Sequence, residues 1–256
     1  QKQATFSDIL KLLHDRDFRD QCLPHIINPD VRAFWEKEFK NYSPKTDLIP
    51  IYNKLGGILS YPSVKRVLVS NTEQISLRKV MDSQKILLVN ISKGNLGSDA
   101  SYILGSLLLT SIASSAFSRI DTPPEKRKVF FCYLDEFQHY TTASIIDMLS
   151  ELRKFKLGLI MAHQYISQLD PKIREAVLGN VGSIVCFRLS QSDARFMEKE
   201  FYPIFVVADF VNLANYEIYL KLMIHGSPSK AFSANTITHH QIKKLYDPIH
   251  ISDSTV

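Results

Sequence analysis

The hydrophobic residues of the first third of the chain recur at helical spacing. In "TFSDILKLLHDRDFRDQCL", apolar positions such as Ile9 and Leu13 fall on one face of a helix. In "NPDVRAFWEKEFK", Asn28 can cap a helix and Pro29 suits the first helical position. We therefore expect residues 1–75 to form an all-helical subdomain.

From "KILLVNIS" onward, strand-like and helical patterns alternate. Strands are predicted at 85–91, 129–135, 157–163 and 182–189, with helices at about 97–119, 142–156 and 171–180. Further on, "EIYLKLMIHG" and "KAFSANTI" predict strands that complete an edge of the sheet, and "HHQIKKLY" predicts a closing helix. Apolar strands separated by helices indicate a mostly parallel sheet with helices on both faces, so residues 76–256 are expected to be an α/β domain.

The predicted strands end in polar residues. These are Asn90 and Ser92, Asp135 and Glu136, His163 and Gln164, and Arg188 through Ser190. Because ligands of open parallel sheets bind at the carboxyl ends of the strands, we expect these groups to share one functional edge.

The stretch "VFFCYLDEFQHY" ends an apolar strand in two adjacent carboxylates. Asp135 is placed as in a nucleotide-hydrolysing sheet, where such a residue holds magnesium, usually through water, and Glu136 could polarise the attacking water. The alternative is that Asp135 caps the next helix, since Asp-Glu pairs are common by chance.

Two further residues extend this hypothesis. Gln164, at the end of the next strand, offers a neutral amide to a γ-phosphate or its water, or else satisfies a strand-end carbonyl. Arg153 lies between the two strands, in a cluster with Lys154 and Lys156. It is either a solvated helix charge or an arginine finger offered to the nucleotide of the next protomer.

Composition sets broad limits. With 45% hydrophobic and 22% charged residues the chain is typical of globular proteins, and its net charge of +5 suits a polyanionic partner without requiring one. The three cysteines have no CxxC spacing, so neither a zinc site nor a disulfide framework is supported and a reducing cytosol is expected. The uncharged stretch at 102–117 predicts a buried helix, and no membrane segment or signal peptide is expected.

One component of a nucleotide site does not occur in this sequence. No GxxxxGK[ST] motif is present, and in the nearest candidate, "SKGNLGSD", Lys93 precedes the glycines. The chain is therefore not expected to enclose a triphosphate by itself.

Several motifs together resemble a known family. In this order they are "LLVNISKGNLGSDASYILGSLLLTSI", "FFCYLDEFQHY", "ELRKFKLGLIMAHQYISQLD", "LGNVGSIVCFRLSQSDARFMEKEF" and "LKLMIHGSPSKAF". The set is similar to type IV secretion coupling ATPases of the TraG/TraD class, in the FtsK–HerA superfamily of DNA-pumping motors. The resemblance implies a RecA-like fold in which residues 1–75 are a helical insertion between Walker A and Walker B. It also implies that the P-loop lies upstream of Gln1 and that this chain is a C-terminal part of a longer protein.

The same resemblance implies a role for each candidate site residue. Asp135 corresponds to the Walker B magnesium residue and Glu136 to the catalytic glutamate. Gln164 corresponds to the sensor of the γ-phosphate and also contributes to cofactor binding, and Arg153 to an arginine finger acting in trans. The later "FR…DA" block implies only a structural or interface role.

The resemblance also implies ATP and Mg²⁺ as cofactors, DNA as a partner, and a hexameric ring. Secretion-channel or relaxase proteins are further expected partners, and the location is cytoplasmic, at the inner membrane if regions outside this chain anchor it. The chain alone is expected to be inactive. Two alternatives stay open: a HerA-like ATPase of DNA processing or defence, and a non-catalytic interaction module that has lost ATP binding.

Overall fold

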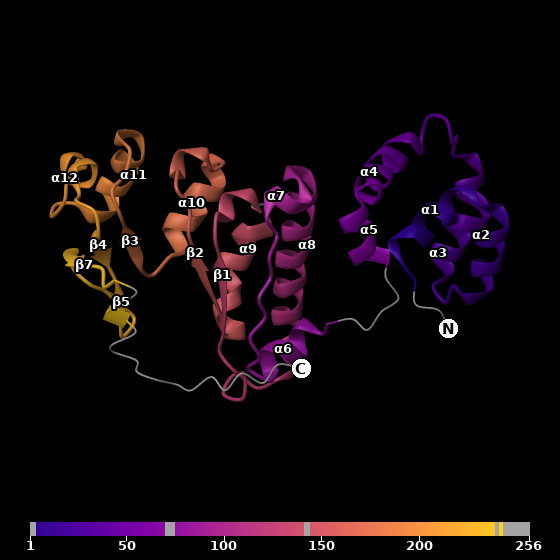
Figure 1. Ribbon diagram of the computed structural model, residues 1–256. Coiled ribbons are helices and arrows are strands. Elements are labelled where there is room, and N and C mark those ends of the chain that lie inside the picture. Colours follow the sequence, from indigo (N-terminus) through magenta and orange to yellow (C-terminus); the bar gives the residue numbers. More distant parts are fainter. Residues whose placement is uncertain (1–3, 70–74, 141–143, 239–240, 243–256) are drawn as a thin grey trace. The chain divides into compact units, whose positions relative to one another are not determined.

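The computed structural model describes residues 4–69, 75–140, 144–238 and 241–242 of the chain (Figure 1). Two compact units interleave along the sequence. Unit 1 comprises Gln1–Cys132, His139–Thr142 and Leu152–Gly158, and unit 2 comprises Tyr133–Gln138, Ala143–Glu151 and Leu159–Val256. The domain division expected between residues 75 and 76 stays a prediction.

The amino-terminal part of unit 1 is helical. It contains α1 (Phe6–His14), α2 (Arg16–Cys22), α3 (Pro29–Ala33), α4 (Ile49–Ser60) and α5 (Pro62–Val69), with the short turns η1 (Leu23–His25), η2 (Phe34–Glu38) and η3 (Phe39–Asn41). The predicted cap of α3 is confirmed, because the Asn28 side chain accepts the backbone N–H groups of Asp30 and Val31 at 2.9 and 3.3 Å. A cap of this kind stabilises a helix by about 1 kcal/mol.

A small aromatic core holds these helices together. Leu13, Phe39 and Leu48 are buried, and Trp35 is among the half-buried residues packed against them. The ring centroids of Trp35 and Phe39 are 4.6 Å apart. Fully burying an apolar side chain contributes roughly 1.5–3 kcal/mol, so Leu13, Phe39 and Leu48 each stabilise this group of helices.

The rest of unit 1 surrounds a buried arginine. Its elements are α6 (Leu77–Asp82), α7 (Lys93–Leu96), α8 (Ser98–Phe117), η4 (Ser118–Asp121) and η6 (Leu152–Phe155). Arg119 is 0% exposed, and its Nε donates to Asp82 Oδ1 at 2.8 Å while Nη1 donates to the carbonyl of Phe155 at 2.9 Å. One guanidinium therefore fixes α6, η4 and η6 to one another.

Helix α8 is long and largely uncharged, with Asp99 in its first turn as its one charged residue. Within the described part of the chain, Ser98–Asp121 is the one segment long and apolar enough to cross a bilayer, judged by length and composition alone. A core helix of a globular protein passes the same test, and Gly105, Leu109 and Ile112 of α8 are buried within the protein. The helix predicted at 97–119 is thus confirmed.

Strands β1 (Phe130–Leu134) and β2 (Leu157–Met161) form a two-stranded sheet. The Phe130 N–H donates to the carbonyl of Lys156, and the Ala162 N–H donates to the carbonyl of Leu134, both at 2.9 Å. The two bonds advance together along both strands, so the strands are parallel and their carboxyl ends lie side by side.

Unit 2 adds helices and an antiparallel sheet. Its elements are η5 (Phe137–His139), α9 (Ser144–Glu151), η7 (Ile166–Gln168), α10 (Pro171–Asn180), β3 (Ile184–Cys186), α11 (Gln191–Phe201), α12 (Val207–Asn212), β4 (Glu217–Lys221), β5 (Met223–Ile224), β6 (Ser227–Pro228) and β7 (Phe232–Asn235). Strand β4 lies between β3 and β7, antiparallel to both, and β5 pairs with β6. Phe201 and Phe210 form the buried aromatic core next to β4.

The α/β class is confirmed, and two strand details differ from expectation. Residues 85–91 have no strand assignment, and Ile86 and Leu88 are 88% and 89% exposed. An apolar run becomes a strand only when a partner backbone pairs with it, and no such pairing occurs within the described residues. Strand β3, expected to continue the parallel sheet, pairs antiparallel with β4 instead, because apolar alternation fixes neither the partner nor the direction of a strand.

Candidate active site

The turn after β1 places two carboxylates at the carboxyl end of the strand. Asp135 is exposed, and its Oδ1 accepts the backbone N–H of Glu136 at 3.0 Å. Glu136 has a φ of 49°, in the left-handed region that few residues other than glycine adopt. The chain therefore reverses sharply at Glu136 instead of continuing the strand.

The Glu136 carboxylate is held by two amides. Gln164 Nε2 donates to Oε1, and Gln138 Nε2 donates to Oε2, each at 2.5 Å. Charge-assisted hydrogen bonds of this kind are short and strong. The structure thus brings Glu136 and Gln164 together, as expected for the ends of neighbouring parallel strands.

Gln138 is the residue that the sequence reasoning missed. It lies in η5, two positions after Glu136, where an amide has no obvious purpose in the sequence. Its contact depends on the left-handed backbone of Glu136 and on the tight turn of η5. The sequence feature that could have indicated this contact is an amide residue placed two positions after Glu136, in the turn that follows the strand.

Asp135 has the chemistry expected of a residue that holds magnesium through water. One carboxylate oxygen is engaged by the Glu136 N–H, and Oδ2 has no protein partner among the described residues. The described residues contain no group of three or more His, Cys, Asp and Glu side chains arranged to hold a metal. A single carboxylate fits Mg²⁺, which keeps several waters and takes its other ligands from a phosphate chain.

His163 directly precedes Gln164 in the chain. Its ring meets the buried ring of Phe137 edge-on, with the centroids 5.1 Å apart, and Nδ1 is buried with no hydrogen-bond partner among the described residues. Burial lowers the pKa of His163, and the charges of Asp193 and Glu136 act in the opposite direction. The neutral imidazole is therefore favoured at neutral pH.

Asp193 braces the loop that follows Gln164. It is only 1% exposed, and its carboxylate accepts the Ser167 N–H at 3.0 Å and the Ser190 hydroxyl at 3.1 Å. These bonds connect η7 to the start of α11. Asp193 therefore has the geometry of a structural support. Arg188, from the same part of the sequence, is exposed and has no side-chain hydrogen bond among the described residues.

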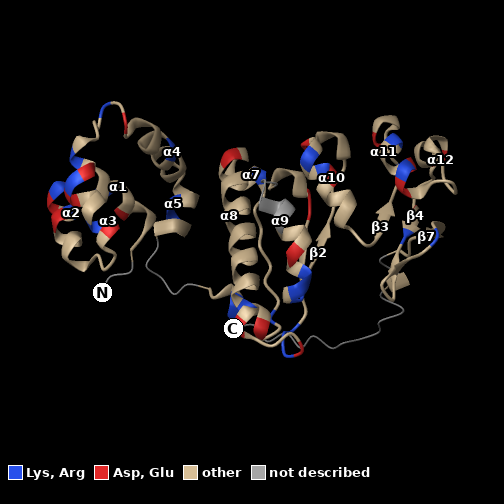
Figure 2. Cartoon of the chain, turned by 180° about the vertical axis from the view of Figure 1, so that it is seen from behind, with Lys and Arg blue, Asp and Glu red and all other residues tan. Residues whose placement is uncertain are grey.

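Arg153 belongs to unit 1, in η6 just before β2. It is exposed, and its guanidinium forms no hydrogen bond or ion pair with the residues that the structure describes. Figure 2 shows the basic stretch that precedes β2 as a blue segment. Its role as an arginine finger stays a prediction.

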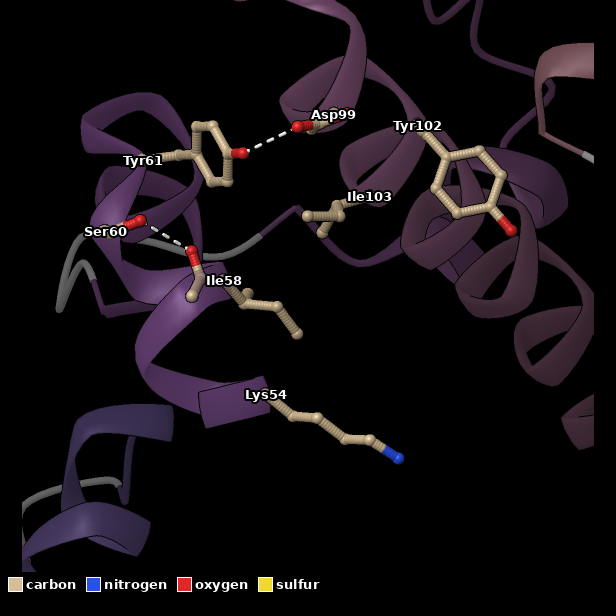
Figure 3. A pocket seen from close by; sticks show the side chains of 8 residues that line it. Lys54, Ile58, Ser60, Tyr61, Asp99, Tyr102 and Ile103 are labelled. Atoms are coloured by element: carbon tan, nitrogen blue, oxygen red, sulfur yellow. Dashed lines mark hydrogen bonds between the residues drawn. The ribbon is translucent and has the colours of Figure 1, made fainter. Parts of the chain in front are cut away.

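A pocket in unit 1 lacks the chemistry of the Glu136 site. It has a volume of about 430 Å³ and is lined by residues of α4 and α8, among them Lys54, Tyr102 and Ile103 (Figure 3). At its rim the Tyr61 hydroxyl donates to Asp99 Oδ2 at 2.8 Å, and this bond raises the pKa of Tyr61. No residue predicted to act in catalysis lines it.

Comparisons with known proteins give matches at the level of structure. No family model matches the sequence, and no curated protein matches it. The bacterial conjugative coupling protein TrwBdeltaN70 matches in its unbound form with a TM-score of 0.60 and 15% identity, over 91% of this chain and 60% of that one. Its sulphate complex matches with a TM-score of 0.61 and 16% identity, over 90% and 60% of the two chains.

A weaker match is the genome packaging NTPase B204 from Sulfolobus turreted icosahedral virus 2 in complex with AMPPCP. Its TM-score is 0.45, at 16% identity over 76% of this chain and 93% of that one. The chain spans 60% of the length of the TrwB structures. Over that span, this chain has the RecA-like α/β fold of the conjugative coupling protein TrwB.

Proposed function

We propose that this chain is the Walker B part of an ATP-driven motor that moves DNA, of the conjugative or type IV secretion coupling kind. One observation carries the proposal: the Glu136 carboxylate and the Gln164 amide meet at 2.5 Å, at the carboxyl ends of two parallel strands. Ligands of open α/β sheets bind at this edge. The likeness of the fold to TrwB supports the same assignment.

Each residue of the site has a distinct role in this proposal. Glu136 accepts a proton from the water that attacks the γ-phosphate, and Gln164 reports the presence of that phosphate. Asp135 would hold Mg²⁺ through a water molecule, and the ion, when bound, neutralises charge on the phosphate chain. Arg153 would reach the nucleotide of a neighbouring subunit, which requires a ring that we propose to be hexameric.

The P-loop in this proposal is supplied by residues outside the chain. The 256 residues contain no GxxxxGK[ST] motif, so we expect the chain alone to bind ATP weakly and to be inactive. We propose a cytoplasmic location for the motor, with secretion-channel or relaxase proteins as its partners.

DNA is proposed as the substrate because the chain is basic. Its net charge is +5 and its pI about 9.0, and the cartoon in Figure 2 shows Lys and Arg positions in both units, mixed with Asp and Glu positions. A motor that acts on many sequences contacts phosphates, so its binding should weaken steeply as salt is raised.

The test is DNA-stimulated ATP hydrolysis by the whole protein, with and without Glu136→Gln. The substitution removes the proton acceptor and keeps the shape, so turnover should fall by about 10²–10⁴-fold while ATP still binds. Glu175→Gln is the matched control, since Glu175 is exposed on α10 and forms no side-chain bond with a described residue.

If Glu136→Gln hydrolyses ATP at the wild-type rate, Glu136 is not the proton acceptor in the reaction. A well-folded whole protein that hydrolyses no ATP, with or without DNA, would favour the non-catalytic interaction module instead.

A further inference from the structure

The Glu136 carboxylate is fixed at both oxygens by residues from different parts of the chain. Gln164, which bonds Oε1, follows β2, whereas Gln138, which bonds Oε2, comes from the turn directly after Glu136 itself. The terminal torsion of a glutamate side chain is broad and two-fold, so one hydrogen bond leaves the carboxylate plane free to turn. Two donors on different oxygens define that plane.

We propose that Gln138 is a positioning residue, which keeps the Glu136 carboxylate in place while Gln164 engages the nucleotide. This inference rests on the proposed function, because it assigns a purpose to Gln138 only if Glu136 is the base. In this proposal the Gln164 amide leaves Glu136 and turns to donate to the γ-phosphate when ATP binds. When its amide turns to the γ-phosphate, Oε1 of Glu136 loses its donor and only the Gln138 bond still orients the carboxylate.

The turn that carries Gln138 is itself anchored. Phe137, the preceding residue, is 1% exposed, and its N–H donates to the carbonyl of Ala162 at 3.1 Å. Ala162 in turn donates to Leu134 at the end of β1. Phe137, the residue before Gln138, is thus bonded to the residue that follows β2, and this bond anchors the turn from which the Gln138 amide reaches Glu136.

The geometry also distinguishes the two oxygens of Glu136. Oε2 stays bonded to Gln138, and Oε1 is the atom freed when Gln164 turns away. In the resulting step, one O–H bond of water breaks and its proton goes to Oε1, while the water oxygen bonds to the γ-phosphorus. The bond from that phosphorus to the bridging oxygen breaks, and ADP leaves with the electron pair.

The experiment compares Gln138→Met and Gln138→Glu in the whole protein. Methionine keeps the length of the side chain and removes the donor, so kcat should fall by about 10- to 100-fold, part of what a positioned base contributes. The KM for ATP and the affinity for a non-hydrolysable analogue should not change. Glutamate replaces the donor by a second negative charge, so kcat should fall further still.

A kcat that falls from wild type to Gln138→Met to Gln138→Glu, with unchanged nucleotide affinity, distinguishes a role in positioning Glu136 from a role in packing. If Gln138 only filled space, both variants would lose stability and nucleotide affinity together with kcat, and that result would overturn the inference. Gln168→Met is the matched control, because Gln168 is exposed on η7 and its side chain has no hydrogen bond within the described residues. Its kcat should equal that of the wild type.

Glu136→Gln, measured alongside, separates the two levels of the proposal. If it is inactive and Gln138→Met has wild-type kcat, the positioning role is wrong and the proposed function stands. If Glu136→Gln keeps full turnover, the proposed function fails, and with it the basis for Gln138. Should Gln138→Met fail to fold, Gln138→Glu decides alone, since wild-type kcat in that variant would equally contradict the inference.

Discussion

At the scale of single residues, His163 shows how a buried ring is placed among charges. It packs on Phe137, and its environment includes the carboxylates of Asp193 and Glu136. Burial lowers the pKa of His163 despite these two charges. Folding therefore opposes the protonation of this imidazole.

Because of His163, stability should fall as the solution is acidified. The folded-state pKa lies below the ordinary value of 6.5, so below that pH the unfolded chain takes up a proton that the folded protein resists. The contribution is fully present above pH 6.5 and is lost as the pH falls toward the folded-state pKa. Denaturant unfolding of the wild type and His163→Gln, from roughly pH 8 to pH 5, measures it.

The free energy of unfolding of the wild type, relative to that of His163→Gln, should decrease as the pH is lowered. A difference between the two proteins that stays constant over this range would show that burial of His163 does not affect its protonation.

At the scale of elements, the Arg119 guanidinium connects three segments of unit 1 that are far apart in the sequence. It is completely buried, and Asp82 is its counterion, with Arg78 also bonded to the same carboxylate. A buried charge that loses its partner is costly, because neither water nor another ion replaces that partner. The packing of α6 should therefore depend on one carboxylate.

Asp82→Asn should destabilise the protein by about 1–3 kcal/mol, less than the loss of a fully buried partner, because the Asp82 side chain is 39% exposed. Asp20→Asn is the control, since Asp20 faces Arg16 across a solvent-exposed pair at 3.7 Å and should contribute about 0–1 kcal/mol. Denaturant unfolding of both variants measures the difference. Equal losses would show that the buried guanidinium does not need Asp82.

At the scale of the whole molecule, the proposed ring places Arg153 and Glu136 in the sites of different subunits. Arg153 has no side-chain bond with the described residues, as a group that acts on a neighbour requires. Its removal should therefore impair the site of the adjacent subunit and leave the Glu136 pair of its own subunit intact.

Arg153→Ala should lower ATP turnover, and mixing it with Glu136→Gln subunits should partly restore activity. In the mixed ring, Glu136 of one subunit can meet Arg153 of the next, which completes a site that neither variant forms alone. ATPase activity against mixing ratio measures the effect, with Lys154→Ala as a neighbouring control. A linear sum of the two separate activities would contradict the action in trans.

The sequence predicted much of the local structure. Helices α8 and α10 and strands β1 and β2 occur where periodicity placed them, and the carboxylates and Gln164 lie at the strand ends as expected. The helix predicted at 142–156 occurs as α9 followed by η6. The closing helix predicted in "HHQIKKLY" lies largely outside the described residues.

The sequence by itself determined segments such as α8, α10, β1 and β2, the residue types at the strand ends and the lack of a P-loop motif. Apolar spacing and capping groups are local properties that a short window contains. Only the tertiary structure decided that β3 turns antiparallel to β4, that residues 85–91 have no strand partner within the described part of the chain, and that Gln138 reaches Glu136. The pairing of β3 and the lack of a partner for residues 85–91 depend on which backbone segment lies beside each of them. The contact of Gln138 depends on the left-handed conformation of Glu136. Both are set by packing between segments that are far apart in the sequence pattern.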